Sequence, residues 1–480
     1  MINDRQFIIT GKVIDGLKSI KLDKKVLNYQ AKLPIHTNKD NSVIIIGDAW
    51  QADMNQQSPY EIIKGWNSGT LDNDVYKIEE SWCGRYVLIV GDRLYQDFAS
   101  QFCTFYDNKG NISSSLNMMT EIFGGGGYVD PKIRHGIGMN YIPGPFTPYK
   151  NIKKVMCSQV LNINTMEVYE RPILFSSVKK LNDRTIKEFS AYFIHSLQEM
   201  RKTIDGEIKM ALTGGYDSRT LLSMIYKAGF DFSCYTFETE YTKGGGDFII
   251  PSILCEKLGI KHQLIRMGEF DKVKYNAYIK HTAGMANDGD LRHYTYGQYD
   301  ELSRGKKINV LYSGIWESFI EYYKKHSNGF QNEPLLLDDI FKAFPDTKLD
   351  ELKIKGFQWF LENKDINKFT TDRNRFYFEE RDGCWMSYIA QGFDMINNVQ
   401  MYQPCNCRLF ASYLLAFNFE ERVDKIHQQK IIAYNCPKIM DIPYADAYPS
   451  ATWNLKKKIK NKLRTYYYYM KWYGVKSLIR

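Results

Sequence analysis

The 480-residue sequence has no long apolar run of the kind that crosses a membrane. None of its runs approaches the roughly 18 residues of a membrane span. The first residues, Met1-Ile2-Asn3-Asp4-Arg5, show no signal-peptide pattern, which predicts a cytoplasmic protein. With 44% hydrophobic and 25% charged residues, the composition is that of a globular chain and not of a disordered one. The length is typical of about two or three domains.

Cysteine pairs with metal-binding spacing are also missing. The nine cysteines are scattered, and Cys405 and Cys407 lie close together without a second pair, which is a weak metal signal. We therefore expect reduced, mostly buried thiols. The glycine run Gly124–Gly127 lacks the Lys-Ser/Thr that follows a phosphate-binding loop, so it predicts a flexible loop.

The net charge of +9 is concentrated at the end of the chain. Residues 451–480 interleave Lys and Arg with aromatic residues such as Tyr466–Tyr469. This pattern predicts a solvated amphipathic helix, with weak contact to a membrane surface as the alternative. Because the charge is local and not spread over the whole sequence, we expect no DNA partner.

Residues 1–180 are predicted to form a β-rich domain. Val43–Ile46 and Tyr86–Val90 are short apolar runs, and the residues on either side of Asn164-Thr165 resemble a hairpin. The proline-rich segment Ile142–Pro148 is typical of a rigid connector.

From about residue 184 the apolar period becomes helical. Ile186–Thr203 predicts a helix with Phe189, Phe193, Leu197 and Met200 on one side. Four strands then alternate with helices, at 208–212, Ser233–Phe237, His262–Arg266 and Ile308–Tyr312. This order indicates an α/β fold with a parallel sheet covered on both faces. Residues 335–450 are predicted to be mainly helical.

The segment Leu212–Arg219, LTGGYDSR, joins the first of these strands to a helix. Gly214 and Gly215 allow a close approach of the backbone to a ligand, and the helix that follows directs unpaired N–H groups toward the turn. Asp217 adds a carboxylate suited to a metal ion and Ser218 adds a hydroxyl donor. The alternative is an ordinary turn in which Asp or Ser caps the helix. Ser313-Gly314 follows another strand, so both loops are expected at one crevice beyond the carboxyl ends of the sheet.

LTGGYDSR resembles Ser-Gly-Gly-x-Asp-Ser, the signature of the asparagine synthase-like branch of the PP-loop ATP pyrophosphatases, which are adenine nucleotide alpha hydrolase-like proteins. The resemblance continues in Asp247–His262 and in VLYSGIWESF at 310–319. It also covers residues in the order of the family's helical part: Phe378-Glu379-Glu380-Arg381, Pro404, Arg422 and Lys430-Ile431-Ile432. Tyr86–Asp107 is similar to a degenerate form of the family's glutaminase domain.

The resemblance implies three segments. They are a degenerate Ntn-like, glutaminase-like β-rich domain at 1–180, a parallel-sheet ATP pyrophosphatase domain of asparagine synthetase type with a helical C-terminal part at 184–450, and a basic aromatic tail at 451–480. It also implies ATP and Mg²⁺ as cofactors. The implied nucleotide-binding residues are Leu212, Thr213, Gly214, Gly215, Asp217, Ser218, Ser313 and Gly314. Asp217 and Glu317 would bind the metal, and Lys430, Glu317 and Arg219 would act in catalysis.

Three departures from the family pattern refine this prediction. Ile2 stands where the glutaminase has its cysteine nucleophile, so no glutaminase activity is expected. Ile315 stands near the family's usual base, and either Glu317 or Ser318 takes the position of its Asp. Arg219 replaces a serine and could reach a phosphate or a carboxylate. Lys430 would meet charge developing on the adenylate, or it is a surface lysine.

The resemblance therefore predicts an ATP-dependent amide-forming ligase. It would adenylate a small-molecule, sugar-acid or peptide carboxylate and transfer it to ammonia or an amine. Two alternatives remain open. A PP-loop enzyme that modifies transfer RNA is suggested by the basic tail, and a non-catalytic ATP-binding pseudoenzyme is suggested by the degenerate first domain.

Overall fold

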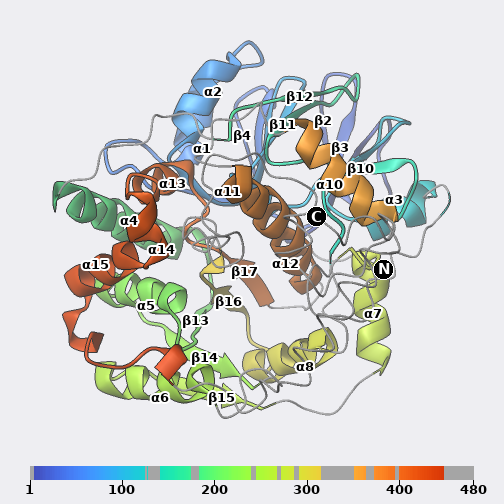
Figure 1. Ribbon diagram of the computed structural model, residues 1–480. Helices are drawn as coiled ribbons and strands as arrows, with labels where there is room; N and C mark the ends of the chain where they lie inside the picture. The colour runs from blue at the N-terminus through green and yellow to red at the C-terminus, as the bar shows by residue number, and fades with distance from the viewer. Residues whose placement is uncertain are drawn as a thin grey trace, which may run out of the picture.

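The computed structural model describes residues 5–124, 127, 141–173, 183–238, 245–266, 272–285, 291–314, 351–363, 372–394 and 399–447. In this part of the chain, two antiparallel sheets come first and one parallel sheet follows (Figure 1). The predicted α/β class is confirmed, whereas the domain boundaries stay predictions. Ile2, Glu317 with its neighbours Ile315 and Ser318, and the tail 451–480 lie outside the described residues.

The first part of the chain is a sandwich of two six-stranded sheets, ordered β10-β8-β9-β1-β3-β2 and β12-β11-β7-β6-β5-β4. The strands are β1 (Phe7–Thr10), β2 (Lys18–Lys21), β3 (Val26–Tyr29), β4 (Ile35–Thr37), β5 (Val43–Gln51), β6 (Trp82–Val90), β7 (Arg93–Gln96), β8 (Phe105–Asp107), β9 (Ile112–Ser113), β10 (Ile152–Lys154), β11 (Gln159–Asn162) and β12 (Val168–Glu170). The predicted runs at 43–46 and 86–90 lie in β5 and β6. The predicted hairpin is confirmed, because Val160 pairs antiparallel with Tyr169.

Apolar clusters fill the space around these two sheets. One cluster lies between them and includes Phe7 and Ile9 of β1 with Ile44 and Ile46 of β5. A second packs the outer face of the β5–β6 sheet against α1 (Pro59–Ile62) and α2 (Asp72–Glu79). The outer face of the β1 sheet shares a third cluster with α3 (Leu116–Phe123) and with later helices. The sandwich and the second part of the chain therefore have a common core.

The second part is built on a five-stranded, wholly parallel sheet with the order β15-β14-β13-β16-β17. The strands are β13 (Glu207–Ala211), β14 (Ser233–Phe237), β15 (His262–Ile265), β16 (Ile308–Leu311) and β17 (Val399–Tyr402). The four predicted strands are confirmed. The fifth, β17, was predicted to be part of a helical region, because four residues are too few to show a period.

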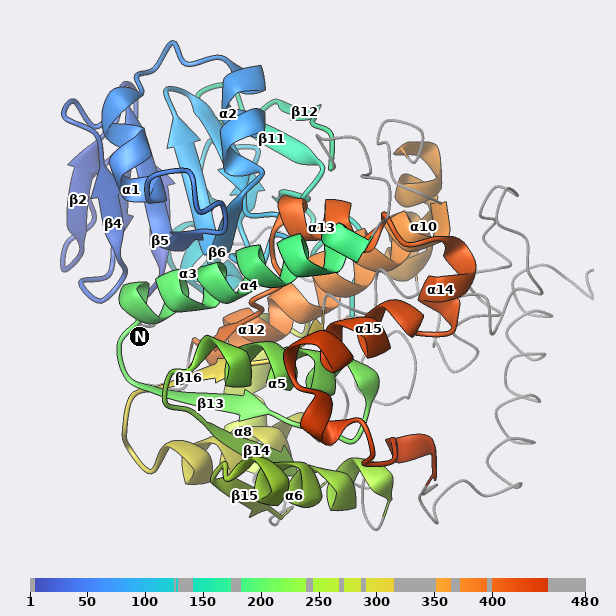
Figure 2. The same ribbon diagram turned by 90° about the vertical axis from the view of Figure 1, so that its left-hand side faces the viewer.

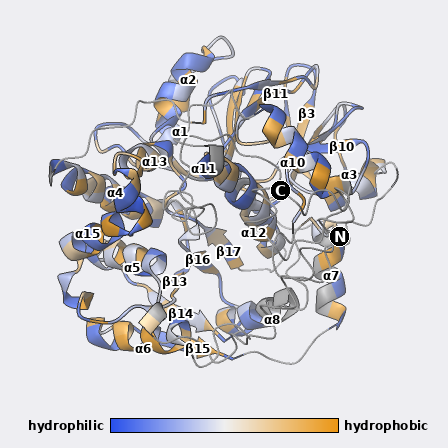
Figure 3. Ribbon diagram, in the orientation of Figure 1, coloured by the Kyte–Doolittle hydropathy of each residue, from blue (hydrophilic) through white to orange (hydrophobic). Residues whose placement is uncertain are grey.

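Helices cover both faces of this sheet. Those of the second part are α4 (Asp183–Thr203), α5 (Tyr216–Ala228), α6 (Gly246–Leu258), α7 (Lys272–Thr282), α8 (Leu291–Ser303), α10 (Glu351–Asn363), α11 (Asp372–Phe376), α12 (Ser387–Phe393), α13 (Arg408–Leu414), α14 (Phe419–Val423) and α15 (Ile426–Asn435). The predicted helix at 186–203 is confirmed as α4, with Phe189, Phe193, Leu197 and Met200 all in the core. Figure 2 shows α4 running between the sandwich and α5. In Figure 3, hydrophobic and hydrophilic residues alternate along α4, as expected for a helix with one buried side.

Within residues 335–450, which were predicted to be mainly helical, one continuous helix runs from Asp372 to Phe393. Its middle, Tyr377–Met386, is π-helical over ten residues. Such π-helical segments occur mostly as short insertions and often at functional sites. The segment is buried between the sandwich and the parallel sheet, and its side chains reach both.

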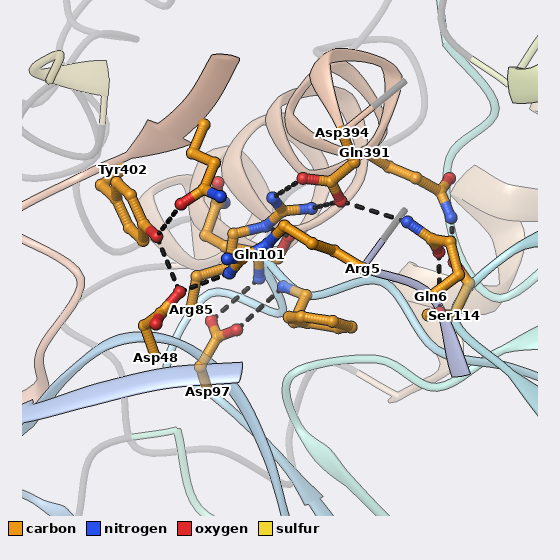
Figure 4. Close-up of polar contacts among 12 residues, drawn as sticks. Arg5, Gln6, Asp48, Arg85, Asp97, Gln101, Ser114, Gln391, Asp394 and Tyr402 are labelled. Atoms are coloured by element: carbon orange, nitrogen blue, oxygen red, sulfur yellow. Dashed lines mark hydrogen bonds and ion pairs between the residues drawn. The ribbon is translucent and has the colours of Figure 1, made fainter. Parts of the chain in front are cut away.

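Buried ion pairs join the two parts of the chain (Figure 4). Arg85 of β6 donates to both carboxylate oxygens of Asp394, at 2.6 and 2.7 Å. Asp48 of β5 accepts from Arg5 and, at 2.7 Å, from the hydroxyl of Tyr402 at the end of β17. These contacts fix the sandwich against the carboxyl edge of the parallel sheet.

All nine cysteines are buried and unpaired, which agrees with the expected state of the thiols. None of the helices that the structure describes has both the length and the apolar composition needed to span a membrane.

Candidate functional site

A cavity of about 400 Å³ lies at the carboxyl edge of the parallel sheet. From β13 the sheet grows to one side through β14 and β15, and the chain then returns to add β16 and β17 on the other side of β13. This reversal is the switch point at which open α/β sheets bind ligands. The structure brings the two predicted loops together here. The cavity is lined by Thr213, Gly215, Asp217 and Ser218 from one loop and by Ser313 and Gly314 from the other.

The turn after β13 is closed by its own hydroxyl groups. Ser218 Oγ accepts from the Thr213 amide at 3.2 Å, donates to the Thr213 carbonyl at 3.0 Å and lies 3.0 Å from Thr213 Oγ1. Gly215 is the N-cap of α5, and no side chain bonds to the helix start from that position. The alternative in which Asp or Ser caps the helix is therefore wrong. The amino end of α5 is open toward a cavity with hydroxyl donors beside it, which suits an anion.

Glycines allow three segments to pack tightly behind this turn. A Cβ on Gly214 would lie 2.7 Å from the Gly246 carbonyl oxygen, and one on Gly246 would lie 2.5 Å from the carbonyl oxygen of Ala445. The Ala445 amide donates to the Gly214 carbonyl at 3.0 Å. Asp247 Oδ1 accepts from the Gly214 amide at 3.1 Å. The glycine at 214 thus serves packing between backbones, while the one at 215 faces the cavity.

We expect Gly246→Ala to lower the stability of the protein. Its new methyl group would overlap the backbone of Ala445, and overpacking of this kind costs about 1–3 kcal/mol. Thermal melting measures the change. The matched control is Gly297→Ala in α8, where no atom lies within 4 Å of the added Cβ, so its melting temperature should stay the same or rise slightly. Equal melting temperatures for the two variants would contradict the packing described here.

Asp217 is the carboxylate of the predicted motif that lines the cavity. Gln428 of α15 donates to its Oδ1 and so orients the group. A second carboxylate, Asp382 of the π-helical segment, lines the same cavity. Burial raises the pKa of the Cys405 thiol, and the nearby Cys407, Asp382 and Asp217 raise it further.

The donor set of the cavity fits a Mg²⁺ ion. Mg²⁺ binds one or two carboxylates together with phosphate oxygens and keeps several waters. Asp217 and Asp382 supply the carboxylates, and the other polar side chains of the lining are hydroxyls, the Arg381 guanidinium and the Trp385 indole. Sequence reasoning missed Asp382 and Gln428. The signal for Asp382 was present, because it directly follows the segment Phe378–Arg381 that carries the resemblance.

Arg219 does not line the cavity, so its predicted contact with a phosphate or carboxylate is wrong. Its side chain is fully buried. The guanidinium donates to the carbonyls of Ile442 and Pro443 at 2.6 and 2.7 Å and lies 3.9 Å above the ring of Tyr444. It anchors the segment that packs on the two glycines, because the helical turn directs position 219 sideways from the cavity.

Lys430 also lies away from the cavity. Its ammonium group pairs with Glu421 at 2.8 Å, and its side chain is 43% exposed. The structure thus places it as a surface lysine, and its predicted contact with the adenylate finds no support in this geometry. Leu212 is buried below the turn and does not line the cavity.

His262, which belongs to the resemblance, supports the motif from below. The Thr236 hydroxyl donates to the Leu212 carbonyl at 2.7 Å, so its oxygen accepts from His262 Nε2 at 3.0 Å. The other ring nitrogen, Nδ1, then accepts from Ser252 Oγ at 3.1 Å. Burial lowers the pKa of His262, which keeps the ring neutral and suited to these two contacts. Its role here is structural.

Gln101 of the sandwich contacts the rear of the cavity, where it meets Gln403, the residue that directly follows β17. A Cβ on Gly314 would lie 3.4 Å from Gln403 Oε1. Gln403 Nε2 donates to Gln101 Oε1 at 3.0 Å, and Gln101 Nε2 donates to the Asp382 carbonyl at 2.9 Å. A side chain of the first part of the chain therefore connects two segments of the cavity wall.

No protein-family model matches the sequence, and no curated protein is significantly similar to it. Among solved structures, the U34-tRNA thiolase NcsA from Methanococcus maripaludis is 12% identical, with 58% of this chain and 70% of that chain covered and a TM-score of 0.25. NMN synthetase from Francisella tularensis is 16% identical, with 49% and 95% covered and a TM-score of 0.21. NAD⁺ synthetase from Burkholderia pseudomallei is 10% identical, with 55% and 93% covered and a TM-score of 0.21.

These similarities are distant, and they carry no argument about what this chain does. What the cavity can bind follows from its own residues. The class that the fold and the cavity define is an α/β protein with a ligand cavity at the switch point of a parallel sheet.

Proposed function

We propose that the protein is an ATP-dependent ligase that activates a carboxylate as its adenylate and transfers the acyl group to ammonia or an amine. The observation that supports this most directly is the pairing of an anion-binding turn with a carboxylate in one cavity. The amino end of α5 directs backbone N–H groups toward the cavity, and Asp217 and the hydroxyl of Ser313 stand beside it. A triphosphate with its metal ion needs both kinds of group.

Each group then has a defined part in the reaction. The backbone N–H groups at the amino end of α5 and the Ser313 hydroxyl would donate to phosphate oxygens, and Asp217 with Asp382 would hold the metal. Mg²⁺, when bound, neutralises charge on the phosphates. Gln428 keeps the Asp217 carboxylate oriented, as a partner of a metal ligand does. Donors set in place before the reaction stabilise the charge that develops on the leaving group.

The proposed reaction has two steps. A carboxylate oxygen of the substrate attacks the α-phosphorus of ATP, and the bond to the bridging oxygen breaks, so that pyrophosphate leaves. The nitrogen of ammonia or an amine then attacks the carbonyl carbon, AMP leaves with the bridging oxygen, and the nitrogen loses a proton to solvent. The proposed absence of a glutaminase rests on Ile2 and stays a prediction, so the nitrogen source is proposed to be external.

Exchange of labelled pyrophosphate into ATP tests this proposal. With Mg²⁺ and a panel of carboxylic acids, we expect exchange that needs an acid but no amine, because the first step is reversible. AMP should accumulate together with an amide once an amine is added. Formation of ADP and phosphate in place of AMP and pyrophosphate would reject the proposal.

One observation favours a second candidate, a non-catalytic ATP-binding protein. Lys430 pairs with Glu421 outside the cavity, so the lysine expected to meet the adenylate is engaged elsewhere. This candidate predicts Mg²⁺-dependent ATP binding by calorimetry with no AMP formed across the same panel. The alternative that acts on transfer RNA rests on residues 451–480, which the structure does not describe, and it stays a prediction.

A further inference from the structure

The half of the cavity away from the phosphate-binding turn is a continuous apolar wall. Tyr299 of α8 packs edge-to-face on Phe237 at the end of β14 and on Phe393 of α12, with ring centroids 4.8 and 4.4 Å apart. All three rings line the cavity, together with Ile389 and Met401. Three separate elements thus contribute to one aromatic surface.

The tyrosine hydroxyls of this wall are already used inside the protein. The Tyr299 hydroxyl lies 2.9 Å from that of Tyr235, and the Tyr312 hydroxyl contacts Met386 Sδ at 3.1 Å. Both tyrosines line the cavity. A ligand on this wall therefore meets ring faces and alkyl groups, while the hydroxyls point to protein partners.

One helix supplies a graded stripe along the cavity. The helix from Asp372 to Phe393 contributes Arg381, Trp385, Ile389 and Phe393 to the lining of the cavity. Arg381 and Trp385 are half-buried, with the guanidinium 3.5 Å above the indole ring. Ile389 and Phe393 are 2% and 4% exposed. The stripe therefore changes from charged and accessible to apolar and buried.

We propose that this wall binds the body of the carboxylate substrate, and that this body is an apolar, ring-bearing or branched group. The inference rests on the ligase proposed above and selects among its possible substrates. A sugar acid would bury several hydroxyls against a wall whose own hydroxyls are taken, and a buried hydroxyl without a partner is costly. An apolar acyl group gives up no hydrogen bonds when it binds there, and the burial of its apolar surface favours binding.

The adenine ring is the rival occupant of the wall. Its edge carries nitrogen donors and acceptors that need partners, and the rings of Phe237, Tyr299 and Phe393 supply none. Backbone groups are exposed at the opposite side, at the ends of β13 and β16, where Gly215 and Gly314 line the cavity. We assign the nucleotide to that side.

Calorimetric titration of carboxylic acids tests the assignment. The full chain, with Mg²⁺ and α,β-methylene-ATP bound, is titrated with 3-phenylpropionate, hexanoate and glucuronate. We expect 3-phenylpropionate to bind at least tenfold more tightly than glucuronate, with hexanoate between them. Ile389→Phe fills part of the cavity beside the wall and should lower the affinity for 3-phenylpropionate at least tenfold. The affinity for α,β-methylene-ATP should change less than twofold.

Ile253→Phe is the matched control, because it makes the same change on the exposed side of α6, outside the cavity. It should leave all affinities unchanged. If Ile389→Phe does not fold, Ile389→Val serves instead, and it should tighten binding of an acid with a second ring. A tenfold loss of nucleotide affinity in Ile389→Phe would place adenine on the wall and overturn the inference, as would preferred binding of glucuronate.

The two proposals fail in different ways. Binding of 3-phenylpropionate that Ile389→Phe weakens, without AMP from any acid, supports the wall and rejects the ligase. AMP formed with glucuronate but not with apolar acids supports the ligase and rejects the wall.

Discussion

Asp217→Asn is expected to reduce AMP formation by about 10²–10³-fold, because metal-assisted charge stabilisation is worth several kcal/mol and each 1.36 kcal/mol is tenfold in rate. Asparagine keeps the size of the side chain and can still contact Gln428, so the fold should be unaffected. The loss should fall on Mg²⁺-dependent nucleotide binding and on the chemical step. Initial rates of AMP release over a range of Mg²⁺ concentrations measure both.

Two further variants separate the carboxylate's role from general damage. Gln428→Leu leaves Asp217 in place but removes the donor that orients it, so the loss should be smaller, about 10–100-fold. Asp441→Asn is the control, because this carboxylate is 71% exposed and pairs with Lys257. It should retain full activity. If Asp217→Asn is as active as Asp441→Asn, the proposed role of Asp217 in the reaction is wrong.

The second large effect is expected at the contact between the sandwich and the parallel sheet. Arg85→Ala leaves Asp394 as a buried charge, with side-chain exposures of 6% and 2% in the intact pair. Breaking a buried ion pair by removing one partner costs about 3–5 kcal/mol. Unfolding by urea, followed by circular dichroism, should show this as a lower midpoint.

Two controls are available: a double variant of the Arg85–Asp394 pair, and a variant of an exposed ion pair. Replacing both Arg85 and Asp394 by leucine should cost less than the single change, because no uncompensated charge remains. Lys64→Ala removes an exposed pair with Glu61, whose side chains are 61% and 54% exposed, and should cost about 0–1 kcal/mol. A midpoint for Arg85→Ala that matches that of Lys64→Ala would show that the buried pair does not hold the two parts together.

This contact also gives the sandwich a role that does not depend on a nucleophile of its own. Phe393 of the cavity wall is adjacent to Asp394, and Gln101 bonds to the backbone of Asp382. The sandwich therefore supports the wall from behind, and Figure 4 shows how its arginines and glutamines converge on that edge.

The sequence by itself determined the elements whose signals are local. The turn at Leu212–Arg219 was predictable because two glycines separate an apolar run from a helical period, and α4 because its core residues repeat at helical spacing. Strands β13–β16 were predictable because each is a short apolar run and helical segments separate them. Such patterns depend on neighbours along the chain, so they are visible before folding.

Only the tertiary structure decided which side chains face the cavity. Asp382 reaches it from a helix some 165 residues after Asp217, while Arg219, only two residues after Asp217, turns away to bind the carbonyls of Ile442 and Pro443. The four residues of β17 form a strand because β16 lies beside them. The physical reason is common to all three: side-chain direction and short-strand stability depend on partners distant in sequence, and only packing brings those partners together.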